Sequence, residues 1–268
     1  MNLFDIKDQV IVVTGVCGQL GLEYANFLTE NNCKMLVGLD LNKSKLLYDS
    51  GLLSKKNFLF IQSDITSKES LSSCVSQLID KHLIPTALIN NAAIDSPPNS
   101  SSAETGPFED YPEISWDRVL DVNLKGVFLC CQAFGKIMAE KTFGSIINVS
   151  SIYGVVSPDQ NLYDYKRAKN EVFYKPVAYA ASKSGILNLT RYLAVYWAKK
   201  NIRVNSLVIA GVFNSQEDEF LEAYCNRIPI GRMAAPSEYC GAVQFLISKA
   251  SSYMTGHALT LDGGWTSI

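Results

Sequence analysis

A lysine follows a tyrosine by four residues at three places in this chain. The pairs are Tyr165 with Lys169, Tyr179 with Lys183, and Tyr196 with Lys200. Residues four apart share one face of a helix, so the lysine ammonium can stabilise its tyrosine as a phenolate. Because an unperturbed tyrosine titrates at about pH 10, a tyrosine that removes protons near neutral pH needs such a neighbour. The spacing therefore indicates general acid–base catalysis at one of these pairs.

The surroundings of the three pairs favour Tyr179 with Lys183. This pair opens an amphipathic stretch that predicts a long helix over 178–200, and a strand-like run follows it. Tyr196 lies near the end of the same stretch, and Tyr165 lies in a polar segment. We therefore predict that Tyr179 is the base and keep Tyr165 as the alternative.

A second candidate site is the glycine-rich segment 14–21, which lies between a strand-like run at 10–14 and an amphipathic run at 20–31. Glycines in this position let the backbone turn tightly and approach a pyrophosphate, which the helix N-terminus then stabilises. Asp40 closes the second strand-like run, 40 − 21 = 19 residues after Gly21. That combination predicts a dinucleotide-binding unit.

Asp40 also bears on which dinucleotide binds. A carboxylate there accepts hydrogen bonds from both ribose hydroxyls and repels a 2′-phosphate, which favours NAD over NADP. The nearby Lys43 and Lys45 leave dual cofactor use open. The alternative is that Asp40 only caps the short helix that follows it.

The elements that must position these residues alternate along the chain as strand and helix. Strands are predicted at 10–14, 34–39, 58–62, 87–90, 145–149, 203–208 and 258–261, and helices at 20–31, 43–52, 68–82, 115–141, 178–200, 216–226 and 237–248. Most of the strands are almost wholly apolar, as strands buried on both faces are. The pattern predicts an α/β fold: one domain over 1–268, a Rossmann-type, doubly wound parallel sheet of about seven strands with helices on both faces.

Three segments of this pattern are predicted as loops that cover a substrate. They are 95–112, 155–176 and 211–228. The first two interrupt the alternation after strand ends, where open α/β sheets bind their ligands. The alternative is that they are solvated insertions.

Composition excludes several classes of function. With 24 Lys+Arg, 26 Asp+Glu and a net charge of −2, the chain has no positive field for nucleic acid. No apolar run reaches membrane-spanning length and no export signal is evident, so we expect a cytoplasmic protein without a membrane partner. The seven cysteines form no C-x-x-C pair and are expected to be reduced and buried. The two histidines, His82 and His257, lie far apart, so no metal site is predicted.

Taken in order, these motifs resemble the short-chain dehydrogenase/reductase family, in its single-domain branch. The matching markers are the 14–21 loop, Asp64, Asn90, Asn91, Ala92, Ala93, Asn123, Ser151, Tyr179, Lys183 and the 261–265 tail. The resemblance covers nearly the whole chain. It also includes a weaker similarity, in the long loops, to members from bacterial surface-sugar and flagellin-glycan pathways.

The resemblance implies an NAD(H)-dependent oxidoreductase that interconverts a secondary alcohol and a ketone. In that reading Tyr179 exchanges the proton, Ser151 holds the substrate oxygen, Lys183 supports Tyr179 and binds the nicotinamide ribose, and Asn123 positions a water that relays the proton. Ser150 is the alternative to Ser151. Tyr165 follows Ser151 by 14 residues and Tyr179 follows it by 28, so choosing Tyr179 implies an insertion in the loop between them.

The same resemblance implies a set of residues around the dinucleotide. They are Gly15, Cys17, Gly18, Gln19, Leu20, Gly21, Asp40, Leu41, Asp64, Ile65, Asn91, Ala92, Ala93, Tyr179, Lys183 and Val212. Two places depart from the family pattern. Gln19 stands where the second glycine is usual, and Ile209 with Ala210 replaces the usual Pro-Gly pair.

The polar loops predict a hydroxylated small-molecule substrate such as a sugar derivative, with or without a phosphate group. Tyr153, Phe173 and Phe213 leave an apolar, steroid-like substrate open. The glycine spacing also leaves open an epimerase or dehydratase related to sugar-nucleotide enzymes. The altered 209–210 segment leaves open a non-catalytic NAD-binding protein. The family implies a homotetramer or homodimer.

Overall fold

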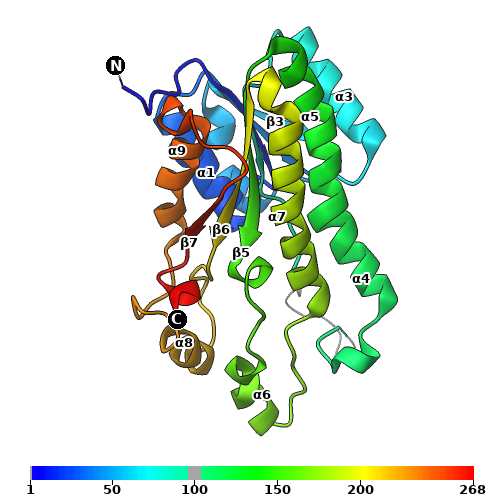
Figure 1. Cartoon of the computed structure of the whole chain (residues 1–268), viewed down its shortest axis with the longest axis vertical. Helices are drawn as coiled ribbons and strands as arrows, with labels where there is room; N and C mark the ends of the chain where they lie inside the picture. The colour runs from blue at the N-terminus through cyan, green and yellow to red at the C-terminus, as the bar shows by residue number, and fades with distance from the viewer. Residues whose placement is uncertain (1, 96–103) are drawn as a thin grey trace.

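The computed structural model describes residues 2–95 and 104–268 and contains a seven-stranded parallel sheet between two layers of helices (Figure 1). The strand order is β3-β2-β1-β4-β5-β6-β7, with every neighbouring pair parallel. The order reverses beside β1, which places a topological switch point between β1 and β4. The predicted fold class is confirmed.

The strands begin and end within one residue of the predicted positions, except that β5 ends two residues later than predicted. They are β1 (Val10–Thr14), β2 (Met35–Asp40), β3 (Phe58–Gln62), β4 (Ala87–Asn90), β5 (Gly144–Ser151), β6 (Ile202–Ile209) and β7 (Ala258–Leu261). Every residue of β1, β4 and β5 is buried, whereas the edge strands β3 and β7 are partly exposed. Burial on both faces explains why the central strands read as continuous apolar runs.

The helices form two layers on the sheet. They are α1 (Gln19–Glu30), α2 (Lys45–Asp49), α3 (Lys68–Asp80), α4 (Glu113–Leu120), α5 (Val127–Lys141), α6 (Asp164–Ala168), α7 (Val177–Trp197), α8 (Asp218–Cys225) and α9 (Cys240–Ile247). Helices α1 and α9 pack on one face, and α3, α5 and α7 on the other (Figure 1). Alternate residues of β1 serve the two layers, with Val10 and Val12 toward α5 and Ile11 and Val13 toward α1.

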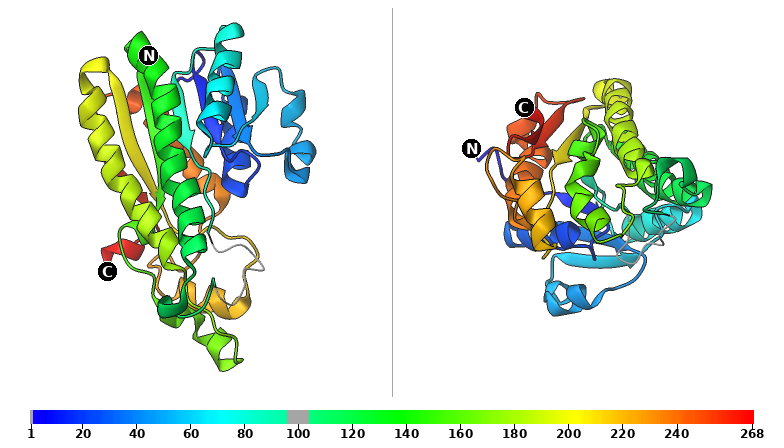
Figure 2. Two further views of the ribbon diagram at one scale, coloured as in Figure 1. Left: turned by 90° about the vertical axis from the view of Figure 1, so that its right-hand side faces the viewer. Right: turned by 90° about the horizontal axis from the view of Figure 1, so that it is seen from below.

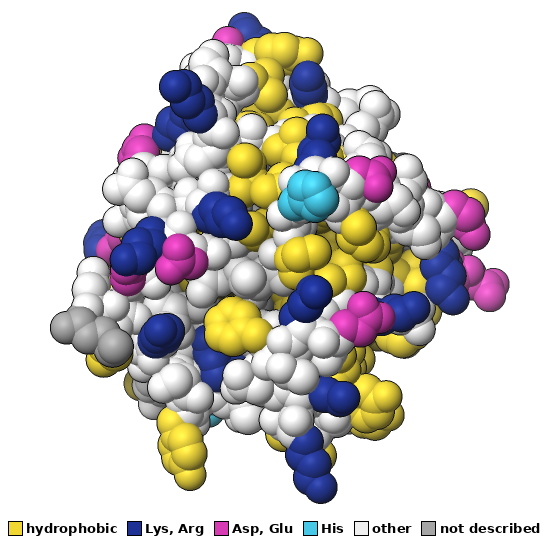
Figure 3. All heavy atoms as spheres, turned by 90° about the horizontal axis from the view of Figure 1, so that it is seen from above, with side chains coloured by type: hydrophobic (Ala, Val, Ile, Leu, Met, Phe, Trp, Pro, Cys, Tyr) yellow, Lys and Arg dark blue, Asp and Glu magenta, His cyan; other side chains and the backbone are white. Residues whose placement is uncertain are grey.

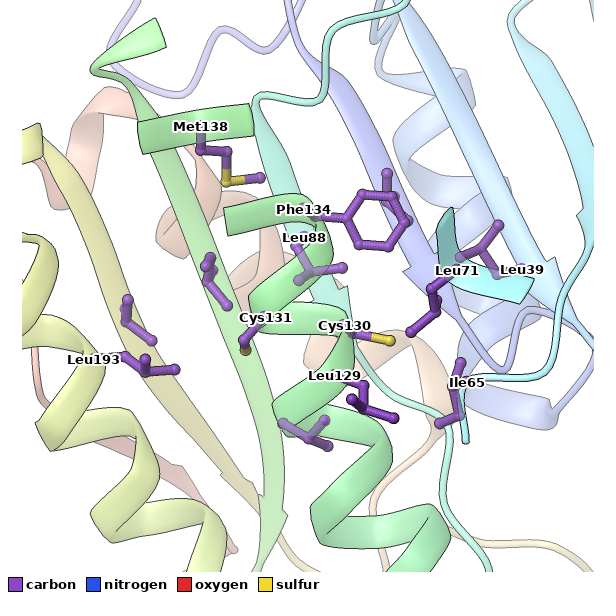
Figure 4. Close-up of a cluster of buried hydrophobic side chains, with 14 of the residues drawn as sticks. Leu39, Ile65, Leu71, Leu88, Leu129, Cys130, Cys131, Phe134, Met138 and Leu193 are labelled. Carbon is purple, nitrogen blue, oxygen red and sulfur yellow. The ribbon is translucent and has the colours of Figure 1, made fainter. Parts of the chain in front are cut away.

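The core beneath α3, α5 and α7 contains three of the cysteines, Cys74, Cys130 and Cys131, and Figure 4 shows the last two. Cys130 and Cys131 on α5 are fully buried beside Phe134. Burial raises the pKa of the Cys131 thiol to about 12, so it remains protonated and inert at neutral pH. The expectation that all seven cysteines are buried is wrong for Cys17 and Cys225, which are half-exposed because both lie in segments above the strand ends.

Two predicted helices differ from the observed ones. The stretch at 43–52 forms a helix only over Lys45–Asp49, because Gly51 takes a left-handed conformation with φ +74° and ends it. The stretch at 115–141 is helical but not uniformly α. Residues Asp121–Gly126 form a π-helical segment between α4 and α5, and Asn123 lies within it. A π segment places an extra residue in the turn and is frequent at functional sites.

Helices α6 and α8 extend beyond the carboxyl ends of the strands, at the lower end of the molecule in Figures 1 and 2. The segment 155–176 contains an unpredicted short helix, α6, whereas α8 in the segment 211–228 corresponds to the helix predicted at 216–226. Of the segment 95–112, residues 96–103 lie outside the described part of the chain.

The opposite end of the molecule carries basic and acidic side chains interspersed over one face (Figure 3). Within the described part of the chain, no helix combines the length and apolar character that crossing a membrane requires.

Candidate active site

Ser151, Tyr179 and Lys183 come together at the carboxyl end of β5. Ser151 is the last residue of β5, and Tyr179 lies in the first turn of α7. Both side chains line the same cavity, and the Ser151 hydroxyl is close enough to the Tyr179 phenol to lower its pKa. One turn further along α7, the Lys183 Nζ lies 5.7 Å from the centre of the Tyr179 ring and donates to the Val149 carbonyl at 2.9 Å. The helix thus places the ammonium and the phenol on one face, as the spacing predicts.

The surroundings shift the pKa values of both groups. Burial raises the pKa of Tyr179 above its ordinary value, and the Asp95 carboxylate raises it further, while the Ser151 hydroxyl lowers it. Burial lowers the pKa of Lys183 to about 8, and Asp95 partly opposes that change. Ser151 and Lys183 are therefore the groups on hand to favour the phenolate over the phenol.

Ser150, the alternative serine, points elsewhere. Its hydroxyl is buried and donates to the backbone carbonyl of Lys183 at 2.8 Å. A methyl group at Gly154 would lie 2.6 Å from that hydroxyl, so the segment after β5 packs directly on it. Ser150 therefore holds β5 against α7, and Ser151 faces the phenol.

Asn123 uses its whole side chain to hold the backbone after β4. Its Oδ1 accepts from the Ile94 amide at 2.8 Å, and its Nδ2 donates to the Ile94 carbonyl at 2.8 Å and to Ser182 Oγ at 3.1 Å. The residue is completely buried. The amide group therefore has no hydrogen left to donate to a water, and any relay through this residue would use its backbone carbonyl.

A cavity of about 630 Å³ opens beside the phenol. Leu20 and Val212 line its side toward the glycine-rich loop, and residues of α6 and α8 line the other side. The predicted Ser151 and Tyr179 lie on its wall, and so do Asp95 and Lys175, which the sequence reasoning did not single out. Lys175 also lies four residues from Tyr179, but it precedes Pro176 and α7, so the helical spacing rule that pointed to Lys183 does not apply to it.

Lys175 and Asp95 form an ion pair across the mouth of the site. The Lys175 Nζ lies 5.2 Å from the centre of the Tyr179 ring and 6.0 Å from that of Tyr153. Its side chain is only 12% exposed. The Tyr179 ring therefore lies near two ammonium groups, that of Lys175, which precedes it in the sequence, and that of Lys183, which follows it.

The two other tyrosine–lysine pairs are arranged differently. Tyr165 lies on α6 and lines the far wall of the cavity, where burial and the neighbouring Glu217 carboxylate raise its pKa. Its partner Lys169 is exposed and donates to Glu219 at 2.8 Å. Tyr196 is 66% exposed on the outer side of α7.

The glycine-rich loop turns closely against the strand ends. Gly15 has φ +68°, and a methyl group there would lie 2.7 Å from the Cα of Ala92. A methyl group at Gly21 would lie 2.1 Å from the Gly15 carbonyl oxygen. Asn91 fixes the same turn, since its Nδ2 donates to the carbonyls of Thr14 at 3.1 Å and Gly15 at 3.3 Å. These contacts leave room only for glycine and keep the start of α1 open to a ligand.

Asp40 ties the end of β2 to this loop. One carboxylate oxygen accepts from the Cys17 amide and the other from the Leu41 amide, both at 2.8 Å. Each oxygen keeps a further lone pair for a hydroxyl group. The glycine cradle and this carboxylate together fit the pyrophosphate and the adenosine ribose of a dinucleotide such as NAD.

The remaining predicted cofactor residues surround the same edge of the sheet. Asp64 caps the turn after β3 by accepting from the Thr66 amide at 2.8 Å, and Ile65 is buried against α5. Ala93 is exposed beside the switch point. Gln19 lies at the start of α1, and its Nε2 donates to the Phe213 carbonyl at 2.8 Å. That bond joins the glycine-rich loop to the segment that contains Val212.

Comparisons with known proteins agree with this architecture. A family model described as short chain dehydrogenase matches residues 9–219. The chain is 31% identical to "Post-translational flagellin modification protein A" of Campylobacter coli, over 97% of this chain and 99% of that protein. It is also 31% identical to "NAD-dependent glycerol dehydrogenase" of Listeria innocua, over 98% of this chain and 96% of that protein.

A solved structure shares the fold throughout. The short chain dehydrogenase of Leptospira borgpetersenii, crystallised with bound NAD+, superimposes with a TM-score of 0.86 at 34% identity and covers 98% of this chain and 94% of its own. A further relative at 30% identity is "5-keto-D-gluconate 5-reductase" of Escherichia coli K12, over 98% of this chain and 97% of that protein.

Proposed function

This chain belongs to the short-chain dehydrogenase family of oxidoreductases, and from that premise we propose that it interconverts a secondary alcohol and a ketone with NAD(H), on a hydroxylated substrate such as a sugar derivative. The observation that carries the proposal is that Ser151 and Tyr179 share one cavity wall while the buried Lys183 Nζ lies 5.7 Å from the centre of the Tyr179 ring. The cavity that Ser151 and Tyr179 face reaches from α8 to the glycine-rich loop.

In this proposal the chain's own groups handle the proton and the substrate oxygen. The Ser151 hydroxyl donates a hydrogen bond to the oxygen of the substrate, and the Tyr179 phenolate removes the hydroxyl proton. Lys183 stabilises the phenolate because its ammonium lies on the same face of α7. Bound NAD+ supplies the other half of the reaction by accepting the hydride from the carbinol carbon. Ketone reduction runs the same steps in reverse, with the phenol as proton donor.

Asp40 and two of the relatives support NAD rather than NADP as the cofactor. A 2′-phosphate would bring negative charge toward the Asp40 carboxylate, whereas ribose hydroxyls can donate to it. The glycerol dehydrogenase relative is named NAD-dependent, and the Leptospira structure contains NAD+. Gln19 and Val212 would border the same dinucleotide.

The test is formation of NADH, followed by its absorbance, with purified protein and a panel of polyols, sugars, sugar acids, nucleotide sugars and steroids. Tyr179→Phe should reduce turnover by at least about 100-fold, because the base contributes about that factor or more. Tyr165→Phe is the matched control, since it removes a phenol from the same cavity, and it should keep most of the activity.

Two results would contradict the proposal. Turnover that survives in Tyr179→Phe but is lost in Tyr165→Phe would mean that the wrong tyrosine has been assigned. Tight retention of NAD without net NADH formation from any compound would instead favour the epimerase-type or non-catalytic alternatives.

A further inference from the structure

The walls of the cavity carry an unusual balance of charge. Its charged lining residues are Asp95, Lys166, Lys175 and Glu217. They form two pairs, Lys175 with Asp95 and Lys166 with Glu217, the second at 3.3 Å. Each cation on the wall therefore already has a carboxylate partner on the same wall.

Among the described residues of this wall, an anionic substrate would find no cation without a carboxylate beside it. To bind a carboxylate or a phosphate, Lys175, whose side chain is only 12% exposed, would have to exchange Asp95 for the ligand or hold two anionic groups beside one ammonium. A hydroxyl group makes no such demand. It can accept a hydrogen bond from the ammonium and donate one to the carboxylate while the pair stays intact.

The pair nearest the phenol is held in position by its surroundings. The Lys175 amide donates to Gln160 Oε1 at 2.8 Å, and Gln160 Nε2 donates back to the Lys175 carbonyl at 3.3 Å. Asp95 directly follows Ile94, whose amide and carbonyl are both bound by Asn123. Both backbones are thus fixed before any ligand arrives, which reduces the entropic cost of binding.

We propose that the Asp95–Lys175 pair binds neighbouring hydroxyl groups of the substrate next to its reacting carbon, and that the site therefore selects an uncharged polyol or sugar over its carboxylated or phosphorylated counterparts. The inference rests on the proposed function and deepens it by naming the substrate class. Lys166 with Glu217 offers a second, matching pair about the far end of the cavity.

The rest of the wall suits the other surface of such a molecule. Tyr153, Tyr163, Phe173 and Phe220 line the cavity between the two ion pairs. Tyr163 stacks between Phe173 and Phe220, with ring centres 4.6 and 5.6 Å away. Aromatic rings provide apolar contact for the C–H face of a polyol while the ion pairs bind its hydroxyl groups.

The experiment compares matched ligands and matched variants. The ligands are sorbitol, gluconate and sorbitol 6-phosphate, and xylitol with its phosphate. Binding is measured by calorimetry on protein saturated with NADH, and kcat and KM are measured wherever turnover occurs. The variants are Lys175→Met, Asp95→Asn and the double variant. Lys169→Met is the control, because Lys169 belongs to the same segment and pairs with Glu219 away from the cavity wall.

The expected result is that neutral polyols bind at least about tenfold more tightly than their anionic counterparts. Each single variant should raise the polyol Kd or KM by about tenfold or more, with a smaller change in kcat in Lys175→Met. The double variant should raise the polyol Kd or KM no more than the worse single variant does, because the two charged groups bind the polyol as a unit. Lys169→Met should bind like the wild type.

Three results would overturn the inference. They are a preference for the anionic ligand of each pair, polyol affinity unchanged in the single variants, and no binding of any neutral polyol. NADH binding by each variant shows that it has folded, and the double variant removes both charges should a single variant fail that check. If the anionic ligand of a pair is the preferred substrate and its turnover is lost in Tyr179→Phe, this inference fails and the proposed function stands.

Discussion

Replacing Asn123 with alanine should destabilise the protein far more than an ordinary polar substitution. The alanine leaves the Ile94 amide and the Ile94 carbonyl without their partner, whereas Ser182 keeps its bond to the Tyr179 carbonyl at 2.7 Å. Each buried backbone group left without a hydrogen bond costs about 1–3 kcal/mol. The two together predict a loss of about 4 kcal/mol, a large share of the total stability of about 5–15 kcal/mol of an ordinary protein.

The measurement is urea unfolding followed by circular dichroism, with Asn31→Ala as the control. Asn31 is exposed and its side chain makes a single bond to the Phe27 carbonyl, so its loss should cost no more than about 0.5 kcal/mol. Asn123→Asp should also be strongly destabilised, because it retains the acceptor for the Ile94 amide but loses both donors and buries a charge.

The reasoning would be refuted if Asn123→Ala stayed within about 1 kcal/mol of the wild type. If that variant were stable but lost its turnover, the amide itself would be part of the chemistry. The structure predicts instead that the variant loses stability, and that turnover falls because Asn123 no longer holds Ile94 and the adjoining Asp95 in place.

Three further predictions concern the base, the glycine cradle and the cofactor. Burial lowers the pKa of Lys183 from 10.5 to about 8, so between these pH values the unfolded chain binds more protons than the folded one. As the pH rises from about 7 to 10.5, the free energy of unfolding of the wild type should therefore increase by up to about 3 kcal/mol relative to that of Lys183→Met, measured by unfolding at a series of pH values. Gly21→Ala should lower the melting temperature and weaken NADH binding, because its methyl group would lie 2.1 Å from the Gly15 carbonyl oxygen. Gly18→Ala, whose methyl group would lie 3.5 Å from the same oxygen, should reduce the free energy of unfolding by at most about 1 kcal/mol. Equal effects of the two substitutions would show that close packing of the glycine-rich loop is not what requires Gly21. Asp40→Asn should reduce the ratio of kcat/KM with NAD to that with NADP by about tenfold or more, and an unchanged ratio would show that this carboxylate does not discriminate.

The sheet could be predicted from the sequence because its strands are buried on both faces. Seven apolar runs of strand length that alternate with segments of helical period admit few arrangements. Helix α7 could be predicted equally well, since its apolar residues recur at helical spacing over its whole length. These features depend on local composition, which a single sequence contains.

The insertion between Ser151 and Tyr179 could not be predicted in the same way. Its helix α6 has only five residues, too few to be stable by propensity alone. It is held instead by contacts with distant residues, such as Lys166 with Glu217 at 3.3 Å, 51 residues further along the chain. For the same reason the pairing of Lys175 with Asp95, 80 residues apart, has no signature in the local pattern.

The π-helical segment shows a subtler limit. The run 115–141 has the period of a helix throughout, and nothing in it marks the six residues that form wider turns. The turn is fixed by tertiary contacts: Asn123 reaches Ile94 on one side and Ser182 of α7 on the other. Sequence reasoning could therefore select the residue but not the contacts by which its side chain holds the backbone of Ile94, next to Asp95.

The two departures from the family pattern meet in space, which explains how the fold accommodates them. Gln19 stands where a glycine is usual, and its side chain donates to the Phe213 carbonyl, just beyond the Ile209–Ala210 segment that replaces a usual Pro-Gly pair. That segment is otherwise held by hydroxyl groups, since Tyr224 accepts from the Gly211 amide at 2.7 Å and Tyr239 donates to the Ala210 carbonyl at 3.3 Å. A proline would preset this turn through its ring, whereas here side-chain bonds from three elements do so. Gln19 thus joins the glycine-rich loop to the segment that follows β6, and a glycine at this position would remove that contact.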